Sequence, residues 1–216
     1  MFNALKSLSK RLASQSGMHK YHWSYINGLV TVVLEGKNIR LRLRDKEDLD
    51  FVYEFWNNVD WYGRYEAIQP QMSKIELAKR IENPHESAFN EVVQWTWFII
   101  EKKDGTKIGA IIHFLVQPAG RVEVGYALVP GERGKGYGTE ALQMMVDYLF
   151  LAKNIERIEA TTDTRNSASQ RILEKVGFKR EGIIRKSGFC RNEWVDDCLY
   201  GILREEWKEP KILTRV

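Results

Sequence analysis

The sequence has only two cysteines, Cys190 and Cys198, among its 216 residues. They form no C-x-x-C pair and suggest no disulfide framework, so we expect two reduced thiols in a cytoplasmic protein. Histidine is nearly as scarce. The chain has four histidines, which are His19, His22, His85 and His113. None of them has the spacing of metal ligands, so no metal site is predicted.

Long apolar runs are also missing. The longest purely apolar stretch is a few residues, so no helix is expected to span a membrane. Hydrophobic residues make up 44% of the chain and charged residues 29%. Both fractions are ordinary for a globular protein, which excludes a disordered or collagen-like chain. The length suits one domain, or one domain with an appendage.

Acidic residues are absent from the first 34 positions. The basic residues of this stretch are Lys6, Lys10, Arg11 and Lys20. The whole chain has 33 basic and 29 acidic residues, so 29 of each remain after position 34 and the net charge of +4 lies at the N-terminus. A nucleic-acid-binding protein more often has a basic stripe on its folded body, so no nucleic-acid partner is predicted.

The N-terminal segment has the pattern of an amphipathic helix. Phe2, Leu5, Leu8 and Leu12 recur at three- and four-residue spacing. We favour a short helix that packs on its own domain or on a second subunit. A targeting or docking segment is an alternative, and so is a shorter chain that begins at Met18.

Hydrophobic patterns predict the secondary structure of the remaining chain. Strands are expected near residues 29–34, 39–44, 94–101, 107–116, 122–129, 157–162, 182–190 and 194–203. Helices are expected from Asp45 to Trp56, from a capping box at Ser73 and Glu76, and over 138–151 and 167–176. The aromatic stretch 57–70 is predicted to be a loop. Strands and helices therefore alternate in an α/β (α+β) order.

The most informative stretch runs from Val122 to Ala141, where a strand enters a glycine-rich turn that opens a long helix. Such a turn directs several backbone N–H groups and the positive end of the helix dipole into one concavity. Arg133 and Lys135 add positive charge, so the turn predicts a phosphate or pyrophosphate site. It fits neither the Walker A pattern, because Gly136 follows Lys135, nor the G-x-G-x-x-G fingerprint. A purely structural helix entry is the alternative.

Arg133-Gly134-Lys135-Gly136-Tyr137-Gly138 resembles the R/Q-x-x-G-x-G/A acetyl-coenzyme A signature of the GNAT N-acetyltransferases. Several further segments are similar to the RimJ/RimL branch, which acts on ribosomal-protein N-termini. They are Arg40–Arg44, Glu123–Tyr126, Thr139–Ala141, the N-x-x-S of Asn166 and Ser169, Arg171–Phe178, Glu181-Gly182, and the W-x-D-x-x-x-Y of Trp194 to Tyr200. Together these segments cover about residues 38–207.

The resemblance implies the GNAT acyl-coenzyme A N-acyltransferase fold, with a mixed central sheet of about seven strands and helices on both faces. The element order inferred from the hydrophobic patterns agrees with this fold. The chain then divides into an N-terminal basic extension at 1–37 with an extra strand as an option, the acetyltransferase domain at 38–207, and a C-terminal tail at 208–216.

The resemblance also implies that acetyl-coenzyme A is the cosubstrate and that no metal is needed. Its pantetheine arm would pair with the backbone of Leu128 and Val129. Its pyrophosphate would lie in the turn formed by Arg133, Gly134, Lys135, Gly136, Tyr137, Gly138 and Thr139. Asn166 would hydrogen-bond the pantetheine or acyl end, and Ser169 lies one helical turn further on the same face. Taken alone, Asn166 suits a helix N-cap and Ser169 a neutral helix position.

Acyl transfer to an amine needs a neutral amine and a donor to the leaving thiolate. Glu123 is the predicted base, directly or through water, because burial beside the cofactor would raise its pKa. A solvated strand residue is the other interpretation of Glu123. Tyr200 and Ser169 compete as the donor to the thiolate, and Tyr200 could equally be a core aromatic residue.

The acceptor pocket is expected to use mostly aromatic residues. They are Trp56, Trp61, Tyr62, Tyr65, Trp95, Trp97 and His113. Core packing explains most of them equally well. One departure from the ribosomal-protein enzymes is Gly188, which stands where their pattern has an acidic residue. This departure weakens any transfer of their acceptor specificity.

The leading prediction is an N-acetyltransferase that transfers acetyl from acetyl-coenzyme A to a primary amine by direct attack in a ternary complex. A protein N-terminal α-amine is the first choice of acceptor, and a small amine (polyamine, amino acid or aminoglycoside) is the second. The alternatives are a catalytically silent sensor or scaffold that binds acetyl-coenzyme A, and a nucleotide-binding protein outside this family. A homodimer is an open option.

Overall fold

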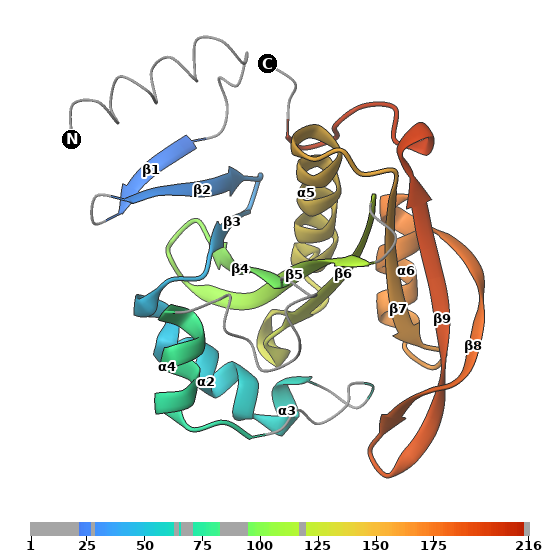
Figure 1. Ribbon diagram of the computed structural model, residues 1–216, viewed down its shortest axis with the longest axis horizontal. Helices are drawn as coiled ribbons and strands as arrows, with labels where there is room; N and C mark the ends of the chain where they lie inside the picture. Colours follow the sequence, from blue (N-terminus) through green and yellow to red (C-terminus); the bar gives the residue numbers. More distant parts are fainter. Residues whose placement is uncertain are drawn as a thin grey trace.

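The computed structural model describes residues 22–26, 29–62, 65, 71–82, 95–116 and 120–213. The helix predicted for Phe2 to Leu12 lies outside these residues. Among the described residues, no helix is long and apolar enough to span a bilayer. The N-terminal extension is represented by two strands at the edge of the sheet (Figure 1).

Nine strands of the described residues form one mixed sheet in the order β1-β2-β3-β4-β5-β6-β7-β9-β8 (Figure 1). All neighbours are antiparallel except β6 and β7, which are parallel. The strands are β1 (His22–Ile26), β2 (Leu29–Glu35), β3 (Ile39–Leu43), β4 (Trp95–Lys102), β5 (Lys107–Val116), β6 (Arg121–Leu128), β7 (Arg157–Asp163), β8 (Lys179–Cys190) and β9 (Glu193–Leu203). The mixed sheet of the predicted fold is confirmed, and β1 at its N-terminal edge is a strand that the hydrophobic patterns did not predict.

The helices follow the predicted positions, with one addition. They are α2 (Leu49–Asn57), α3 (Val59–Tyr62), α4 (Lys74–Glu82), α5 (Tyr137–Ala152) and α6 (Ser167–Val176). The one-turn helix α3 lies inside the stretch that was predicted to be a loop, and four residues are too few to produce a helical period. Gly177 ends α6 with a φ of 115°, the left-handed conformation that favours glycine after a helix.

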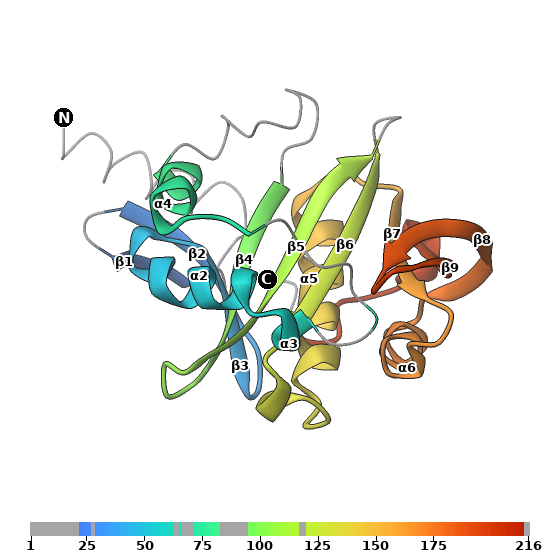
Figure 2. The same ribbon diagram turned by 90° about the horizontal axis from the view of Figure 1, so that it is seen from below.

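The two faces of the sheet are covered by different helices (Figure 2). Phe98 and Ile100 of β4 lie in the core that α5 and α6 cover, whereas Ile99 between them packs with Val52 of α2 and Leu77 of α4. Successive strand residues point to opposite faces, so this single strand contributes to both cores. Helices α5 and α6 therefore share one face, and α2 and α4 cover the other.

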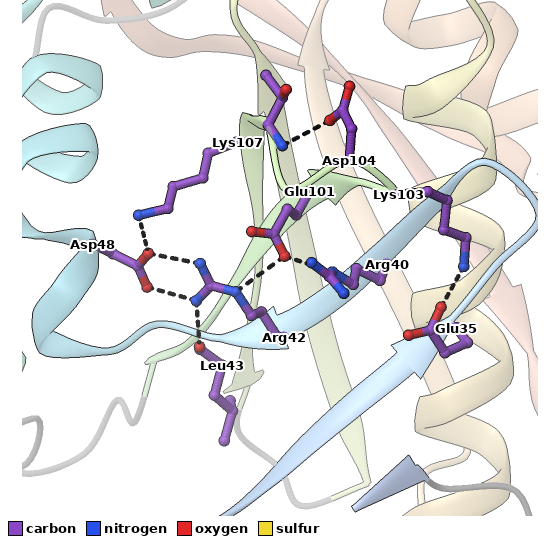
Figure 3. Close-up of polar contacts among 10 residues, drawn as sticks. Glu35, Arg40, Arg42, Leu43, Asp48, Glu101, Lys103, Asp104 and Lys107 are labelled. Carbon is purple, nitrogen blue, oxygen red and sulfur yellow. Dashed lines mark hydrogen bonds and ion pairs between the residues drawn. The ribbon is translucent and has the colours of Figure 1, made fainter. Parts of the chain in front are cut away.

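A buried ion network fixes the beginning of α2 (Figure 3). The carboxylate of Asp48 is fully buried, and both guanidinium NH groups of Arg42 donate to it at 2.8 Å. Lys107 of β5 lies 2.7 Å from the same carboxylate, and Arg42 also reaches Glu101 of β4 at 3.3 Å. Burial alone would raise the pKa of Asp48, but the hydrogen bonds from Arg42 and Lys107 outweigh it and lower that pKa. The network thus ties α2 to β3, β4 and β5.

Candidate functional site

The parallel strands β6 and β7 are paired over only three residues. Their register runs from Arg121 beside Arg157 to Glu123 beside Glu159 and ends there. Beyond Glu123 the two strands part, which opens the sheet between the second half of β6 and the start of α6. The parting therefore begins at the pair Glu123 and Glu159.

The opened edge of β6 presents main-chain groups. Val129 donates its N–H to the carbonyl of Ile108 on β5 at 2.9 Å. Because hydrogen-bonded and non-bonded pairs alternate along an antiparallel ladder, the main-chain groups of Leu128 and Tyr126 point away from β5, toward the parted side. Val129 also accepts from the N–H of Glu132 at 3.0 Å, so its own main chain is used within the protein. Leu128 and Tyr126 therefore present main-chain groups to the parted side, where the Leu128 carbonyl also accepts from the Arg133 side chain.

The glycine-rich turn continues from this edge into α5. Gly134 and Gly136 have φ values of 75° and 88°, the left-handed region that favours glycine. A Cβ atom at either position would meet no atom within 4 Å, so the space beside both residues is open. Gly136 is the N-cap of α5, and the first N–H groups of the helix face this space. The turn thus suits an anionic group that approaches the backbone closely.

The charged residues of the turn also contact other elements. Arg133 donates through Nε to the carbonyl of Leu128 at 2.9 Å, and a second guanidinium nitrogen donates to the carbonyl of Trp61 in α3. Lys135 pairs with Glu132 at 3.0 Å, and the hydrogen bond from Lys135 lowers the pKa of Glu132. Arg133 therefore joins the turn to α3 as well as adding positive charge.

The remaining predicted residues of the turn lie in the first turn of α5. Tyr137 is half-buried and packs against the core, and Thr139 is half-buried behind it. Gly138 is buried, and a Cβ atom there would lie 3.3 Å from Ile172 of α6 and 3.7 Å from Leu128. Gly138 therefore allows α5 and α6 to pack closely, a role that differs from that of Gly134 and Gly136.

The start of α6 faces the opened edge of β6. Asn166 is the N-cap, and its side-chain oxygen accepts from the N–H of Ser169 at 3.1 Å. The Ser169 hydroxyl lies 3.1 Å from the hydroxyl of Tyr126, which reaches across from β6. The sequence analysis quoted Tyr126 within a motif but gave it no role. The signal available was its place two residues before Leu128, on the same side of the strand.

Glu123 lies at the point where β6 and β7 part. Its carboxylate is half-buried and accepts from the hydroxyl of Thr161 on β7 at 3.1 Å. Burial raises the pKa of Glu123, the Thr161 hydrogen bond partly opposes this, and the negative charges of Glu159 and Asp197 add to the rise. A carboxylate with a raised pKa at the mouth of a gap is suited to take up a proton.

Tyr200 lies in a different environment from Ser169. Its side chain is fully buried, and its hydroxyl donates to Glu174 of α6 at 3.0 Å. Burial raises its pKa to about 12. The Tyr200 hydroxyl is thus engaged inside the core by Glu174.

The predicted acceptor aromatics divide between the two faces of the sheet. The rings of Trp56 and Trp97 lie 5.6 Å apart, and Trp61 packs on Phe55 at 6.0 Å. The guanidinium of Arg165 lies 5.9 Å from the ring of Tyr65. The side chains of Tyr62 and Trp95 lie outside the described part of the structure.

His113 lies apart from the tryptophans of this group. Its ring lies between Phe98 and Tyr148 of α5, at 6.2 and 6.4 Å, on the face opposite to Trp97. Burial lowers its pKa to about 4, so the imidazole is neutral near pH 7. Its Nε2 has no hydrogen-bond partner among the described residues.

Two arginines bind α3 to elements on either side of the gap. Arg191, in the turn of the β8–β9 hairpin, donates to the carbonyl of Val59 at 3.0 Å. Arg133, in the glycine-rich turn, donates to the carbonyl of Trp61. Helix α3 is therefore bound to the hairpin at one point and to the turn at another, with Glu123 on the sheet face that α2 and α3 cover.

An opened parallel pair beside a glycine-rich helix start defines a site for an extended ligand with an anionic end, next to a half-buried carboxylate. Residues 38–179 match the family model described as acetyltransferase (GNAT) domain. The chain belongs to this family of N-acetyltransferases, whose members use acetyl-coenzyme A.

Individual proteins agree with this assignment. The uncharacterized N-acetyltransferase YoaA of Bacillus subtilis (strain 168) is 30% identical over 173 residues, which are 80% of this chain and 97% of that protein. The ribosomal-protein-S5-alanine acetyltransferase of Vibrio fischeri superposes with a TM-score of 0.71 at 24% identity, over 82% of this chain and 99% of that one. The spermidine N-acetyltransferase of Vibrio cholerae, solved with CoA and spermine, superposes with a TM-score of 0.69 at 22% identity. The match covers 79% of this chain and 98% of that one. Both structures show that the fold is shared.

Proposed function

We propose that this enzyme acetylates an amine at the end of a chain, with the α-amine of a protein N-terminus as its acceptor. The observation that carries the proposal is the double attachment of α3, through Val59 to Arg191 and through Trp61 to Arg133. A helix bound at both sides of the gap favours an acceptor that enters end-on over a polypeptide that runs through the site. The resemblance to the ribosomal-protein branch supports the same acceptor.

The proposed cofactor contacts follow from the geometry of the gap. The main chain of Leu128 and Tyr126 would pair with the pantetheine arm like an additional strand. The turn from Arg133 to Thr139 would hold the pyrophosphate, with the closest approach at Gly134 and Gly136. Asn166 has its side-chain oxygen fixed by the cap, so its amide N–H groups remain as donors to the pantetheine or acyl end.

Acetyl-coenzyme A supplies an activated thioester, and the protein supplies a base and a hydrogen-bond donor. The nitrogen of the acceptor attacks the carbonyl carbon, a carbon–nitrogen bond forms, and the carbon–sulfur bond breaks with its electron pair on sulfur. Glu123 takes the proton that the nitrogen loses, directly or through water. Ser169 donates a hydrogen bond to the sulfur. General-base assistance of this kind contributes about 10²–10⁴-fold to the rate.

A second acceptor class, a small polyamine, is favoured by the carboxylates near the site. Asp197 of β9 lies on the same sheet face as Glu123 and Thr161, because Asp163 and Asp197 are paired in register. A side chain at Gly188 would approach the Asp197 carboxylate to 3.6 Å. Asp197 therefore places negative charge next to the position where the ribosomal-protein enzymes have an acidic residue, and a cationic acceptor would benefit from it.

One experiment separates the two classes. The full chain is incubated with acetyl-coenzyme A and either peptides with free or blocked N-termini, each containing an internal lysine, or spermidine and spermine. Acetylated products are located by mass spectrometry. Acetylation of the free N-terminus, with the blocked peptide unmodified, supports the first proposal, and acetylation of the polyamines alone supports the second. Acetylation of internal lysines in the blocked peptides would contradict end-on entry.

A further inference from the structure

Tyr126 extends from β6 across the gap to the start of α6. Its neighbours Val124 and Leu128, two residues to either side, are buried in the core under α5, and the Tyr126 ring is half-buried on the same face. A Cβ atom at Gly138 would lie 4.0 Å from the ring, so the ring lies next to the first turn of α5. Its hydroxyl is thereby held next to Ser169.

Two contacts join this hydroxyl to Ser169. The Tyr126 oxygen lies 3.1 Å from the Ser169 hydroxyl and 3.4 Å from the Ser169 carbonyl oxygen. The single phenol proton can be donated in only one of these two contacts, and the hydroxyl pair is the shorter one. It is also the contact in which either oxygen can be the donor. A phenol is a stronger acid than an aliphatic alcohol, so Tyr126 is the better donor of the two. When Tyr126 donates to the Ser169 oxygen, the Ser169 proton is directed to another acceptor.

We propose that Tyr126 is a positioning residue, which donates to the Ser169 hydroxyl and turns the Ser169 proton toward the sulfur of coenzyme A. The inference rests on the proposed function, because that proposal places the sulfur in the gap. Asn166 contributes by fixing the Ser169 main chain from the other side through its cap. The serine is thus held by two partners, one on its backbone and one on its oxygen.

The consequence is chemical, since a hydrogen bond to sulfur stabilises the thiolate relative to the thiol. The thiol of bound coenzyme A should therefore ionise at lower pH in the wild type than in a variant that lacks either hydroxyl. This property needs no acceptor amine, so it is independent of the acceptor class.

The experiment titrates coenzyme A bound to the full chain and follows the ultraviolet absorbance of the thiolate. We expect Ser169→Ala and Tyr126→Phe each to raise the pKa of the bound thiol by about 0.5 or more, which is a threefold change in its ionisation. The double variant should shift no further than Ser169→Ala alone, because Tyr126 acts through Ser169. Tyr148→Phe, which removes a hydroxyl from α5, is the matched control and should leave the thiol pKa unchanged.

A second variant covers the case in which Tyr126→Phe does not fold. Replacing Tyr126 by 3-fluorotyrosine retains the ring and makes the phenol a stronger donor, so it should shift the thiol pKa downward, opposite to Tyr126→Phe. A purely structural tyrosine would produce no shift with this analogue.

The outcomes separate this inference from the proposed function. Coenzyme A that binds with the same thiol pKa in the wild type and in Tyr126→Phe overturns the role of Tyr126 and leaves the proposed function intact. Shifts that add in the double variant overturn it as well, because the two hydroxyls would then act independently. Failure of the wild type to bind coenzyme A would overturn the proposed function, and this inference with it.

Discussion

The indole Nε1 of Trp207 donates a hydrogen bond to the carboxylate of Asp147 at 3.0 Å, where Asp147 is fully buried in α5. The other oxygen of the same carboxylate accepts the main-chain N–H groups of Lys211, Ile212 and Leu213, at 3.0, 2.8 and 3.1 Å. A single side chain of the central helix therefore holds the described part of the C-terminal segment, which was predicted to be a separate tail.

Replacing Asp147 by alanine should strongly destabilise the protein. Five donors lose their acceptor, because Gln143 also donates to this carboxylate at 3.2 Å. Hydrogen bonds to a charged group contribute about 1.5–3 kcal/mol each, although their losses are not additive. We expect the free energy of unfolding in urea to fall by at least about 3 kcal/mol. The matched control is Glu156→Gln, whose exposed carboxylate lies 4.0 Å from Arg204 and should change stability by less than about 0.5 kcal/mol. Equal stability of the Asp147 variant and the wild type would show that the C-terminal segment contributes little.

The ion network of Asp48 predicts a specific dependence of stability on pH. The folded-state pKa of Asp48 is lowered, so its stabilisation is present above the unfolded-state pKa and is lost as the pH falls through the folded-state pKa. Arg42→Met should cost about 3–5 kcal/mol at pH 7, because it removes both Arg42 hydrogen bonds from the buried Asp48 carboxylate. The difference between the wild type and Asp48→Asn should be large at pH 7 and shrink below pH ~4, as measured by urea unfolding. A difference that is constant from pH 7 to pH 2 would contradict the lowered pKa.

Local patterns in the sequence were sufficient to predict where most strands and the glycine-rich turn lie along the chain, but not the direction of several side chains. His113 lies on β5, where Ile108, Ala110 and Ile111 are all buried because both faces of this central strand are covered. Such a strand has no alternation of apolar and polar residues, so the face of His113 could not be inferred. Tyr126 and Ser169 are 43 residues apart, and only the tertiary packing of α6 against β6 brings their hydroxyls together.

Gly136 should be sensitive to substitution for a reason that differs from backbone strain. Gly136→Val would place a side chain in the open space beside the turn and should raise the Kd for coenzyme A at least tenfold. Two or three charge-assisted contacts, each about 1.5–3 kcal/mol, would be lost. Gly105 is the matched control, because it also has a φ of 88° and open space but lies in the β4–β5 turn.

Gly105→Val should carry the same strain, about 1–2 kcal/mol, and leave the Kd for coenzyme A unchanged. Calorimetric titration of both folded variants measures the difference. If the two variants bind coenzyme A equally well, the glycine-rich turn is not the pyrophosphate site.

Glu123→Gln should lower kcat by about 10²-fold or more, with the Kd for coenzyme A within twofold of the wild type. The pKa of Glu123 is raised, so the wild-type kcat should decrease as the pH falls through this raised pKa. Thr161→Val removes the hydrogen bond that partly opposes the rise, so it should move this decrease to higher pH and leave kcat at high pH unchanged. A pH–rate profile from pH 5 to pH 9 checks both variants. A profile of Thr161→Val that coincides with the wild type would exclude Glu123 as the titrating base.

The attachment of α3 predicts that substitutions of Arg191 and Arg133 affect acceptor binding and cofactor binding differently. Arg191→Ala removes the contact of the β8–β9 turn with Val59 and should raise the KM for the acceptor at least threefold, because α3 is no longer fixed at that end. It should leave the Kd for coenzyme A unchanged, since Arg191 lies in the β8–β9 hairpin and not in the glycine-rich turn. Arg133→Ala should raise both quantities, because Arg133 contacts Trp61 and also lies in the proposed pyrophosphate turn. Steady-state kinetics together with calorimetry distinguishes the two patterns. An acceptor KM that rises in Arg133→Ala but not in Arg191→Ala would mean that α3 is positioned from the turn alone, and that the hairpin does not close the acceptor end of the gap.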